Sequence, residues 1–189
     1  MVNKKFFQQM KKDYSKSEGE RRQIISMSNL ILHDSKRVIF SLHRGDMKKG
    51  EDSLKEIEEK LTYLDKKFGH TRIVQEGSYK ASVEEYVEAK MFYRYIHGQK
   101  VDKIQKIKID YDSYMGGISD LTGEMVRLAI NNASKGRLDE VEKIKQSIND
   151  IIAEMVEFDM TGYLRTKYDQ AKTNLKKIEQ IDYEIKIRR

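Results

Sequence analysis

Two acidic residues in the middle of the chain have a spacing that suits metal chemistry. Glu85 and Glu88 are three residues apart, so on a helix both carboxylates project from one side. Apolar residues flank that side from Val83 to Ile96, and a helix that is apolar over most of its circumference is expected in the centre of a bundle. Two carboxylates on such a helix need cationic partners, because burying an unpaired charge is costly.

A second acidic pair follows on another stretch of helical periodicity. Asp120 and Glu124 are four residues apart and therefore also share a helix face. If the two helices are neighbours, four carboxylates converge, and each like-charge pair at about 5 Å costs roughly 3 kcal/mol at an effective dielectric constant of about 20. Such a cluster takes up protons, pairs with cations or binds a metal. Ligation by carboxylate oxygens alone is what Mg²⁺ or Mn²⁺ prefers.

The same residues also fit an ordinary structural role. Glu85 has the spacing of the last member of a capping box that begins at Ser82, and Glu124 can pair with Arg127 along its own helix. The pattern alone leaves both the metal site and the structural role open. Other acids lie opposite an apolar stripe and are expected to face solvent: Glu51, Asp52, Glu56 and Glu59.

The composition and periodicity predict an all-α protein. The 189 residues include no proline, and 36% are charged while 38% are hydrophobic. Hydrophobic positions recur at helical spacing almost throughout, which predicts six or seven long helices of about 15 to 28 residues in one bundle and one domain, residues 1–189. A capping box is expected at Ser17 and Glu20, and helix ends are expected at Gly45, Gly69, Gly98 and Gly136. A loop is expected over residues 70–80, followed by a helix from about Ser82 to Ile96. Gly116 and Gly117 are expected to precede the next helix.

Several classes of protein are excluded by the residue types. Cysteine is absent, which excludes disulfides, thiolate metal sites and cysteine nucleophiles. No apolar run approaches the roughly 20 residues that span a bilayer, and no hydrophobic segment follows the basic N-terminus. We therefore expect a cytoplasmic protein without a membrane partner.

The basic charge is compatible with a polyanionic partner. Net charge is +6 and the sequence pI is about 9.2. Nucleic acid is the commonest partner of such proteins, and solubility alone explains the charge equally well. The four histidines lack a paired spacing and are expected to be polar or capping groups. Candidate nucleic-acid contacts are Lys66, Lys67, His70, Arg72 and Lys80, with Tyr79 to stack on a base, then Lys36, Arg37 and Arg44, and then Lys4, Lys5, Lys11, Lys12 and Lys16.

Four segments of the sequence resemble the translin family, and in particular its nuclease-competent branch, the translin-associated factor X proteins. Glu85–Ala89 (EYVEA) is similar to the acidic motif of that branch, and Gly116–Arg127 (GGISDLTGEMVR) is similar to the family's most recognisable segment. The other two segments are Ser35–Asp46 (SKRVIFSLHRGD), at the end of the first helix, and Tyr168–Arg189, the closing helix with its basic end.

The resemblance implies a seven-helix bundle of long antiparallel helices that assembles into a homo-octamer. It implies binding of single-stranded or imperfectly paired RNA, with single-stranded DNA as a further ligand. The candidate contacts for this RNA are basic residues chosen above for their charge: Lys66, Lys67, His70, Arg72, Lys80, Arg37 and Arg44. It also implies Mg²⁺-dependent endoribonuclease activity, with Mn²⁺ as a substitute. The catalytic acids of the branch fall on Glu85, Glu88 and Asp120, and Glu124 completes the set of metal ligands. The alternative is a non-catalytic RNA- and DNA-binding oligomer like translin itself, a branch that lacks the Glu85–Glu88 pair.

Overall fold

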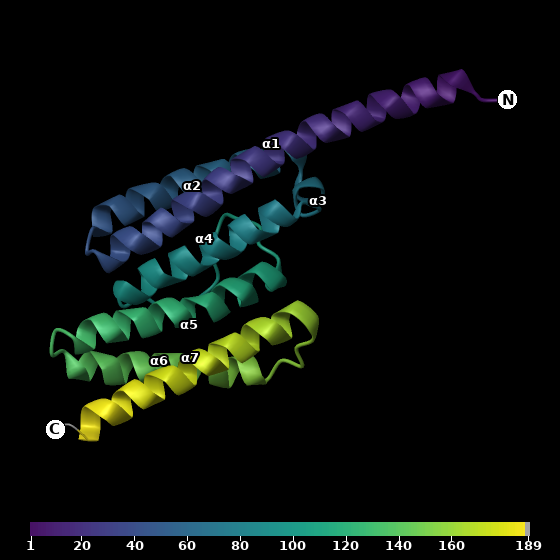
Figure 1. Ribbon diagram of the computed structural model, residues 1–189. Coiled ribbons are helices and arrows are strands. Elements are labelled where there is room, and N and C mark those ends of the chain that lie inside the picture. Colours follow the sequence, from purple (N-terminus) through teal and green to yellow (C-terminus); the bar gives the residue numbers. More distant parts are fainter. Residues whose placement is uncertain (188–189) are drawn as a thin grey trace.

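The computed structural model describes residues 1–187, and this part of the chain folds into seven α-helices without a β-strand (Figure 1). The prediction of an all-α bundle is therefore confirmed. Arg188 and Arg189, at the basic end of the last segment of the resemblance, lie outside the described residues. The helices are α1 (Lys4–His43), α2 (Met47–Phe68), α3 (His70–Ile73), α4 (Gly77–Ile96), α5 (Tyr111–Ala133), α6 (Leu138–Val156) and α7 (Gly162–Ile187).

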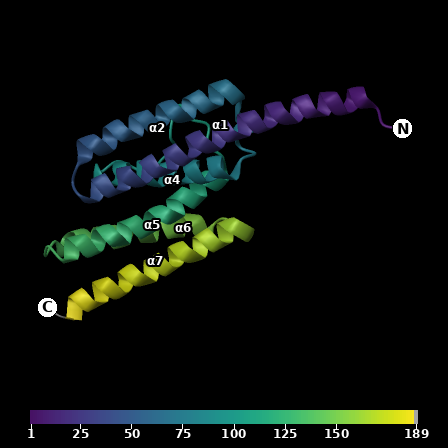
Figure 2. The same ribbon diagram turned by 45° about the horizontal axis from the view of Figure 1, so that its top comes forward.

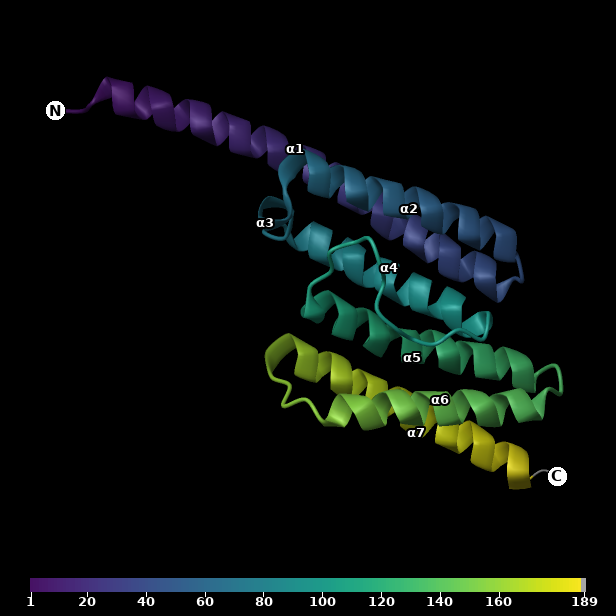
Figure 3. The ribbon, with the colours of Figure 1, turned by 180° about the vertical axis from the view of Figure 1, so that it is seen from behind.

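Helices α4 and α5 form the centre of the molecule. Helix α4 packs on α1 and α5, α5 packs on α6 and α7, and α2 covers α1 (Figures 1 and 2). The connection over residues 97–110 crosses α4 and α5 on the side of α2 and α6 (Figure 3). Helices α1, α4, α5 and α7 consequently share the opposite face (Figure 1).

Helix α4 is buried around most of its circumference, as its residue pattern predicts. Tyr86, Val87, Met91 and Phe92 are completely excluded from solvent. Burying side chains of this size contributes roughly 1.5–3 kcal/mol each before conformational entropy is subtracted. The position of α4 in the bundle therefore follows from its sequence, and any acid on α4 lies close to the interior.

Two glycines let α4 and α5 approach closely. Gly116 and Gly117 lie inside α5, so the expectation that they precede a helix is wrong. A Cβ atom on Gly117 would lie 2.6 Å from the backbone oxygen of Glu84, and one on Gly116 would overlap the Glu84 carboxylate. Glycine inside a helix costs about 1 kcal/mol relative to alanine. Here that cost is offset by the contact of the two central helices.

Other differences from the expected boundaries concern polar stretches of helix. Helix α1 begins at Lys4 with Asn3 as its N-cap, so the predicted capping box at Ser17 and Glu20 is wrong. The loop predicted over residues 70–80 is also wrong, because α3 and the first turn of α4 occupy it. Polar helix without an apolar stripe carries no periodic signal in the sequence. The ends predicted at glycines are confirmed, each with positive φ: Gly45, Gly69, Gly98 and Gly136.

The first turns of α1 project beyond the bundle (Figure 1). Every residue from position 1 to 17 is exposed, and the part of α1 in this stretch carries four large apolar side chains: Phe6, Phe7, Met10 and Tyr14. No helix within residues 1–187 combines the length and the apolar character needed to cross a lipid bilayer.

Candidate functional site

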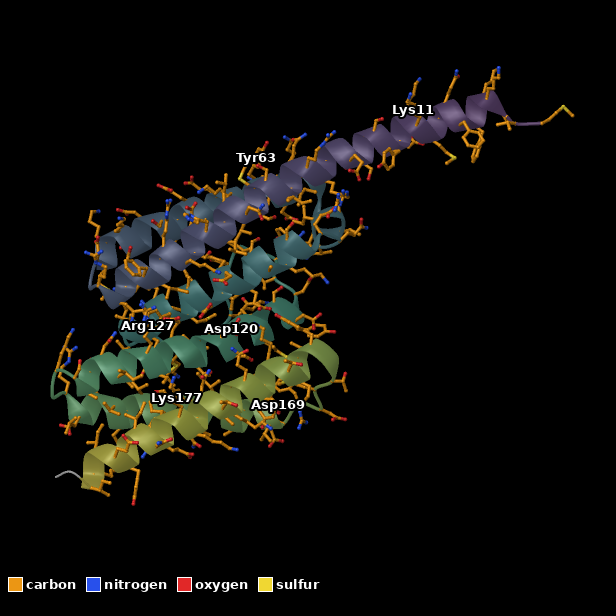
Figure 4. All side chains as sticks on the ribbon, in the orientation of Figure 1. Lys11, Tyr63, Asp120, Arg127, Asp169 and Lys177 are labelled. Carbon is orange, nitrogen blue, oxygen red and sulfur yellow. The ribbon has the colours of Figure 1, made fainter. Side chains whose placement is uncertain are left out.

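The four acids singled out in the sequence line one cleft, called the acidic cleft below. Helix α4 contributes Glu85 and Glu88, and α5 contributes Asp120 and Glu124. The cleft has a volume of about 450 Å³. Figure 4 shows Asp120 and Arg127 along α5 and Lys177 and Asp169 along α7. The remaining lining residues are Lys36, Ile39 and Phe40 of α1, Gly123 and Arg127 of α5, and Gln170 and Asn174 of α7.

Glu88 is the most buried of these acids. Its exposed fraction is 8%, and no hydrogen bond or ion pair found within residues 1–187 involves its carboxylate. Burial, and after it the negative charges of Glu85, Asp120 and Glu124, raise the pKa of Glu88 to about 9. At neutral pH Glu88 therefore carries a proton unless a cation enters the cleft.

Glu85 and Asp120 each pair with one lysine. The Lys36 Nζ lies 3.4 Å from Glu85 Oε1, and burial still raises the pKa of Glu85 above its usual range. The Lys167 Nζ lies 2.5 Å from Asp120 Oδ2, and burial likewise raises the pKa of Asp120 against the effect of this lysine. The pKa values of two of the acids around Glu88 are thus also raised, although each acid has a lysine partner.

Lys167 of α7 joins Asp120 to an acid that the sequence pattern did not identify. The same Nζ lies 2.7 Å from Glu84 Oε1, and the Tyr163 hydroxyl donates to Glu84 as well. Burial alone would lower the pKa of Lys167, but its hydrogen bonds to Asp120 and Glu84 raise it above the ordinary value. No local pattern could reveal this contact, because Lys167 comes from a helix far along the chain.

Glu124 is held by a buried histidine that sequence reasoning treated as an ordinary polar group. His43 Nε2 lies 2.5 Å from Glu124 Oε2, and the His43 side chain is only 3% exposed. Burial raises the pKa of Glu124, but the hydrogen bond from His43 and the charge of Arg127 outweigh it, so this pKa is lowered. An ionised carboxylate only accepts hydrogen bonds, so His43 Nε2 carries the proton. The pairing of Glu124 with Arg127 along α5, at 3.5 Å, is confirmed.

The donor set of the acidic cleft fits a divalent cation, although its side chains are not in a coordinating arrangement. Among residues 1–187, no three histidine, aspartate or glutamate side chains form a group that could hold a metal ion. Glu88 has no cationic partner in the described chain, and hard divalent cations bind carboxylate oxygens. The capping-box role considered for Glu85 is wrong, because Ser82 lies inside α4 and donates its hydroxyl to the Tyr79 carbonyl.

The predicted nucleic-acid contacts His70 and Arg72 lie away from the acidic cleft. Arg72 bonds to Glu76 at 2.8 Å and approaches Glu20 of α1, which lies about 24 Å along that helix from Lys36 in the lining of the acidic cleft. His70 lies between Asp65 and Asp110, at 3.7 and 3.3 Å. Arg72 is thus paired with acids, and His70 lies within reach of two carboxylates.

The lysines of this group are accessible, whereas the tyrosine is not. Lys66, Lys67 and Lys80 are exposed, and Lys67 donates to Gln23 and to the Tyr63 hydroxyl. Tyr79 is only 3% exposed, so its predicted role in base stacking is wrong.

The candidate contacts on α1 lie nearer to the acidic cleft. Arg37 is largely exposed and pairs with Asp34 at 3.5 Å, and the Arg44 guanidinium lies over the Phe40 ring. Lys36 itself lines the cleft. Cations on this part of α1 can therefore approach an anion bound near the acids.

The fold and the cleft define a class of all-α bundles with a carboxylate-lined site across the central helices. The fold is similar to the crystal structure of apo-NeC3PO, with a TM-score of 0.86 and 22% identity over 97% of both chains. It is also similar to the structure of an AfC3PO–duplex RNA complex, with a TM-score of 0.85 and 19% identity over 97% of both chains.

The chain belongs to the translin family, because the family model matches residues 19–189. Translin-associated protein X of Rattus norvegicus is 26% identical, over 96% of this chain and 78% of its own length. An uncharacterised Methanocaldococcus jannaschii protein is 27% identical, over 85% of this chain and 73% of its own length. Gallus gallus translin is 30% identical, over 49% of this chain and 41% of its own length.

Proposed function

We propose that this protein is a metal-dependent endoribonuclease that cuts single-stranded or imperfectly paired RNA at the acidic cleft. The observation that carries the proposal is Glu88, a carboxyl buried beside three other acids, for which the described residues supply no cation. A structural acid in such a position would be expected to have a lysine or arginine partner. A carboxyl group that binds a divalent cation does not need a lysine or arginine partner.

Glu85, Glu88 and Asp120 would hold Mg²⁺ or Mn²⁺, with Glu124 as a further ligand or as an acceptor for a bound water. The ion supplies Lewis-acid polarisation of a phosphoryl oxygen and lowers the pKa of a water. His43 fixes the carboxylate of Glu124 through its hydrogen bond. Lys36 and Arg127, both about half exposed at the rim, attract the phosphate groups of the strand.

RNA as the substrate is supported by a relative and by the charge of the chain. AfC3PO, which has a similar fold, has a solved structure in complex with duplex RNA. The chain carries a net charge of +6, and exposed cations lie on α1 beside the acidic cleft. Lys66, Lys67, His70, Arg72, Lys80, Arg37 and Arg44 stay predicted RNA contacts, with the exposed Lys66, Lys80, Arg37 and Arg44 the most available.

Cleavage of an end-labelled single-stranded RNA by the purified protein tests the proposal. We expect product with Mg²⁺ or Mn²⁺ and none with EDTA. Glu88→Gln keeps the size and hydrogen-bonding capacity of the side chain but removes the charge, and it should slow cleavage at least about 100-fold. Binding of the same RNA in EDTA should change less than about threefold. Glu59→Gln, an exposed position of α2, is the matched control. Equal cleavage by Glu88→Gln and by the wild type would refute the proposal.

One observation favours the alternative of a non-catalytic RNA- and DNA-binding protein. Lys167 already neutralises Asp120, as a permanent ion pair would in a purely structural site. In that case neither metal would yield product, while RNA binding would still weaken steeply with salt. The cleavage assay above separates the two functions.

We also propose that the protein assembles into a homo-octamer. Large apolar residues are exposed on the projecting part of α1, and Tyr111 is exposed at the start of α5, Phe158 in the α6–α7 connection and Tyr163 at the start of α7. These exposed apolar groups support association. Light scattering coupled to size-exclusion chromatography should give about eight times the chain mass of 22.3 kDa. A monomer at all concentrations would contradict this assembly.

A further inference from the structure

A second and larger cleft lies at the end of the bundle where the α1–α2 and α5–α6 turns meet the end of α4. Its volume is about 880 Å³. We call it the basic cleft, because four cationic side chains line it: Arg44, Lys135, Arg137 and Lys143. An apolar wall completes it, formed by Met47, Tyr95, Ile96, Leu128 and Ile144.

Most of the positive charge in the basic cleft is uncompensated. Lys143 pairs with Glu140 at 2.8 Å, the one acid of the lining. The Arg137 Nη2 donates to the neutral Asn132 Oδ1 at 2.7 Å. Within residues 1–187, neither Arg44, Lys135 nor Arg137 has a carboxylate partner. Three cations in a concave surface focus a positive potential that attracts anions.

A buried histidine forms part of the wall between the two clefts. His43 lines the basic cleft, and its Nε2 bonds to Glu124, which lines the acidic cleft. The other ring nitrogen, Nδ1, is buried and has no hydrogen-bond partner in the described part of the chain. A buried polar atom without a partner costs about 1–3 kcal/mol, and such atoms mark places that a water or a ligand completes.

We infer that the basic cleft binds phosphate groups of the nucleic-acid strand that passes through the acidic cleft, a few nucleotides from the bond that is cut. This inference rests on the proposed function, since it assigns a further part of the substrate to the same molecule. Glu124 lines the acidic cleft and Asn131 lines the basic cleft, and the two residues lie about 10 Å apart along α5. The apolar wall beside Tyr95 accommodates a sugar or a base, while Arg44, Lys135 and Arg137 contact the phosphates.

Equilibrium binding of a fluorescent single-stranded RNA, measured by anisotropy in EDTA at several salt concentrations, tests the inference on intact protein. The variant is Arg44→Glu/Lys135→Glu, because both side chains are exposed and neither makes an ion pair within residues 1–187. The matched control is Lys103→Glu/Lys106→Glu, which changes the same charge at exposed positions of the 97–110 connection. Adenosine 5′-monophosphate serves as a second probe, to distinguish a strand from a free nucleotide.

We expect the cleft variant to bind RNA at least about tenfold more weakly at 0.1 M salt, and the slope of log K against log salt to fall by about 1.4 for two lost contacts. The control should differ from the wild type by less than about threefold. Equal binding by the cleft variant and the control would overturn the inference, as would binding of the mononucleotide as tight as that of the strand. Failure of cleavage with the expected loss of binding would refute the nuclease and leave the basic cleft in place.

Discussion

The acidic and basic clefts lie on either side of His43 and differ in which of their charged groups have partners of opposite charge. Both cations that line the acidic cleft, Lys36 and Arg127, are paired with a carboxylate, and so is Lys167, which bonds to Asp120. Glu88 still lacks a partner in the described chain. In the basic cleft, three of four cations have no acid in the described chain. The difference teaches that net charge alone does not locate a site: the unpaired groups do. The acidic cleft holds a carboxyl group without a cationic partner, and the basic cleft holds cations without an anionic partner.

The sharpest test of this comparison is the pH dependence of stability. The pKa of Glu88, raised to about 9, lies above its unfolded value near 4.5, so the folded state binds the extra proton between these limits. The stability that this proton contributes is complete below about pH 4.5 and is lost as pH rises towards 9, by roughly 1.4 kcal/mol per pH unit. Denaturant unfolding between pH 6 and 9 should therefore show wild-type stability falling by about 4 kcal/mol more than that of Glu88→Gln.

Two controls accompany this measurement. Lys135→Gln, in the basic cleft, should keep the wild-type pH dependence. Mg²⁺ should stabilise the wild type more at pH 8 than at pH 6, because a proton competes with the cation for Glu88. Parallel pH curves for the wild type and Glu88→Gln would contradict the described burial of this acid.

A second test separates the clefts through the packing of α4 on α5. Gly117→Ala places a methyl group against the Glu84 backbone and Val87, which should lower the free energy of unfolding by about 2 kcal/mol and displace the carboxylates. RNA binding in EDTA should change less than threefold, because the basic cleft is built at the helix ends. Gly123→Ala is the matched control, since the nearest atom to its Cβ, Asn174 Nδ2, is at an ordinary 3.5 Å. A Gly117→Ala protein as stable as Gly123→Ala would contradict the close contact.

The smallest expected effect comes from the lysine that holds Asp120. Lys167→Met removes the cation shared by Asp120 and Glu84 and should lower stability without metal by about 1 kcal/mol. Added Mg²⁺ should then raise the melting temperature of this variant more than that of the wild type, because a free Asp120 is a better ligand. Lys172→Met, an exposed pair with Asp169 on the same helix, should show the wild-type response. An identical Mg²⁺ response of both variants would favour a permanent structural role for Lys167.

The helices and the shared acidic cleft were predictable because both depend on local periodicity. Apolar spacing placed α4 in the interior, and i, i+3 and i, i+4 spacings placed two carboxylates on one side of each helix. The partners of these acids were not predictable. His43 and Lys167 reach the cleft from α1 and α7, and only the tertiary packing brings them there.

Errors in the prediction arose where polar residues continue a helix. The first turns of α1 lack any buried residue, and α3 lies in a stretch without apolar period, so a pattern of burial could reveal neither. Tyr79 was expected to be available for stacking on a base, yet it is buried in the core. Gly116 and Gly117 were expected to precede a helix, whereas they lie inside α5 where it contacts α4.

The projecting start of α1 has a thermodynamic consequence of its own. Residues 4–16 extend about 20 Å with exposed side chains throughout, and a helical segment of this length is marginal in water without packing. Its amide protons should exchange rapidly in dilute protein and slow down as concentration rises, if Phe6, Phe7, Met10 and Tyr14 are covered by a second copy. The rate of amide exchange in residues 4–16 then measures the degree of association directly, independently of any ligand in either cleft.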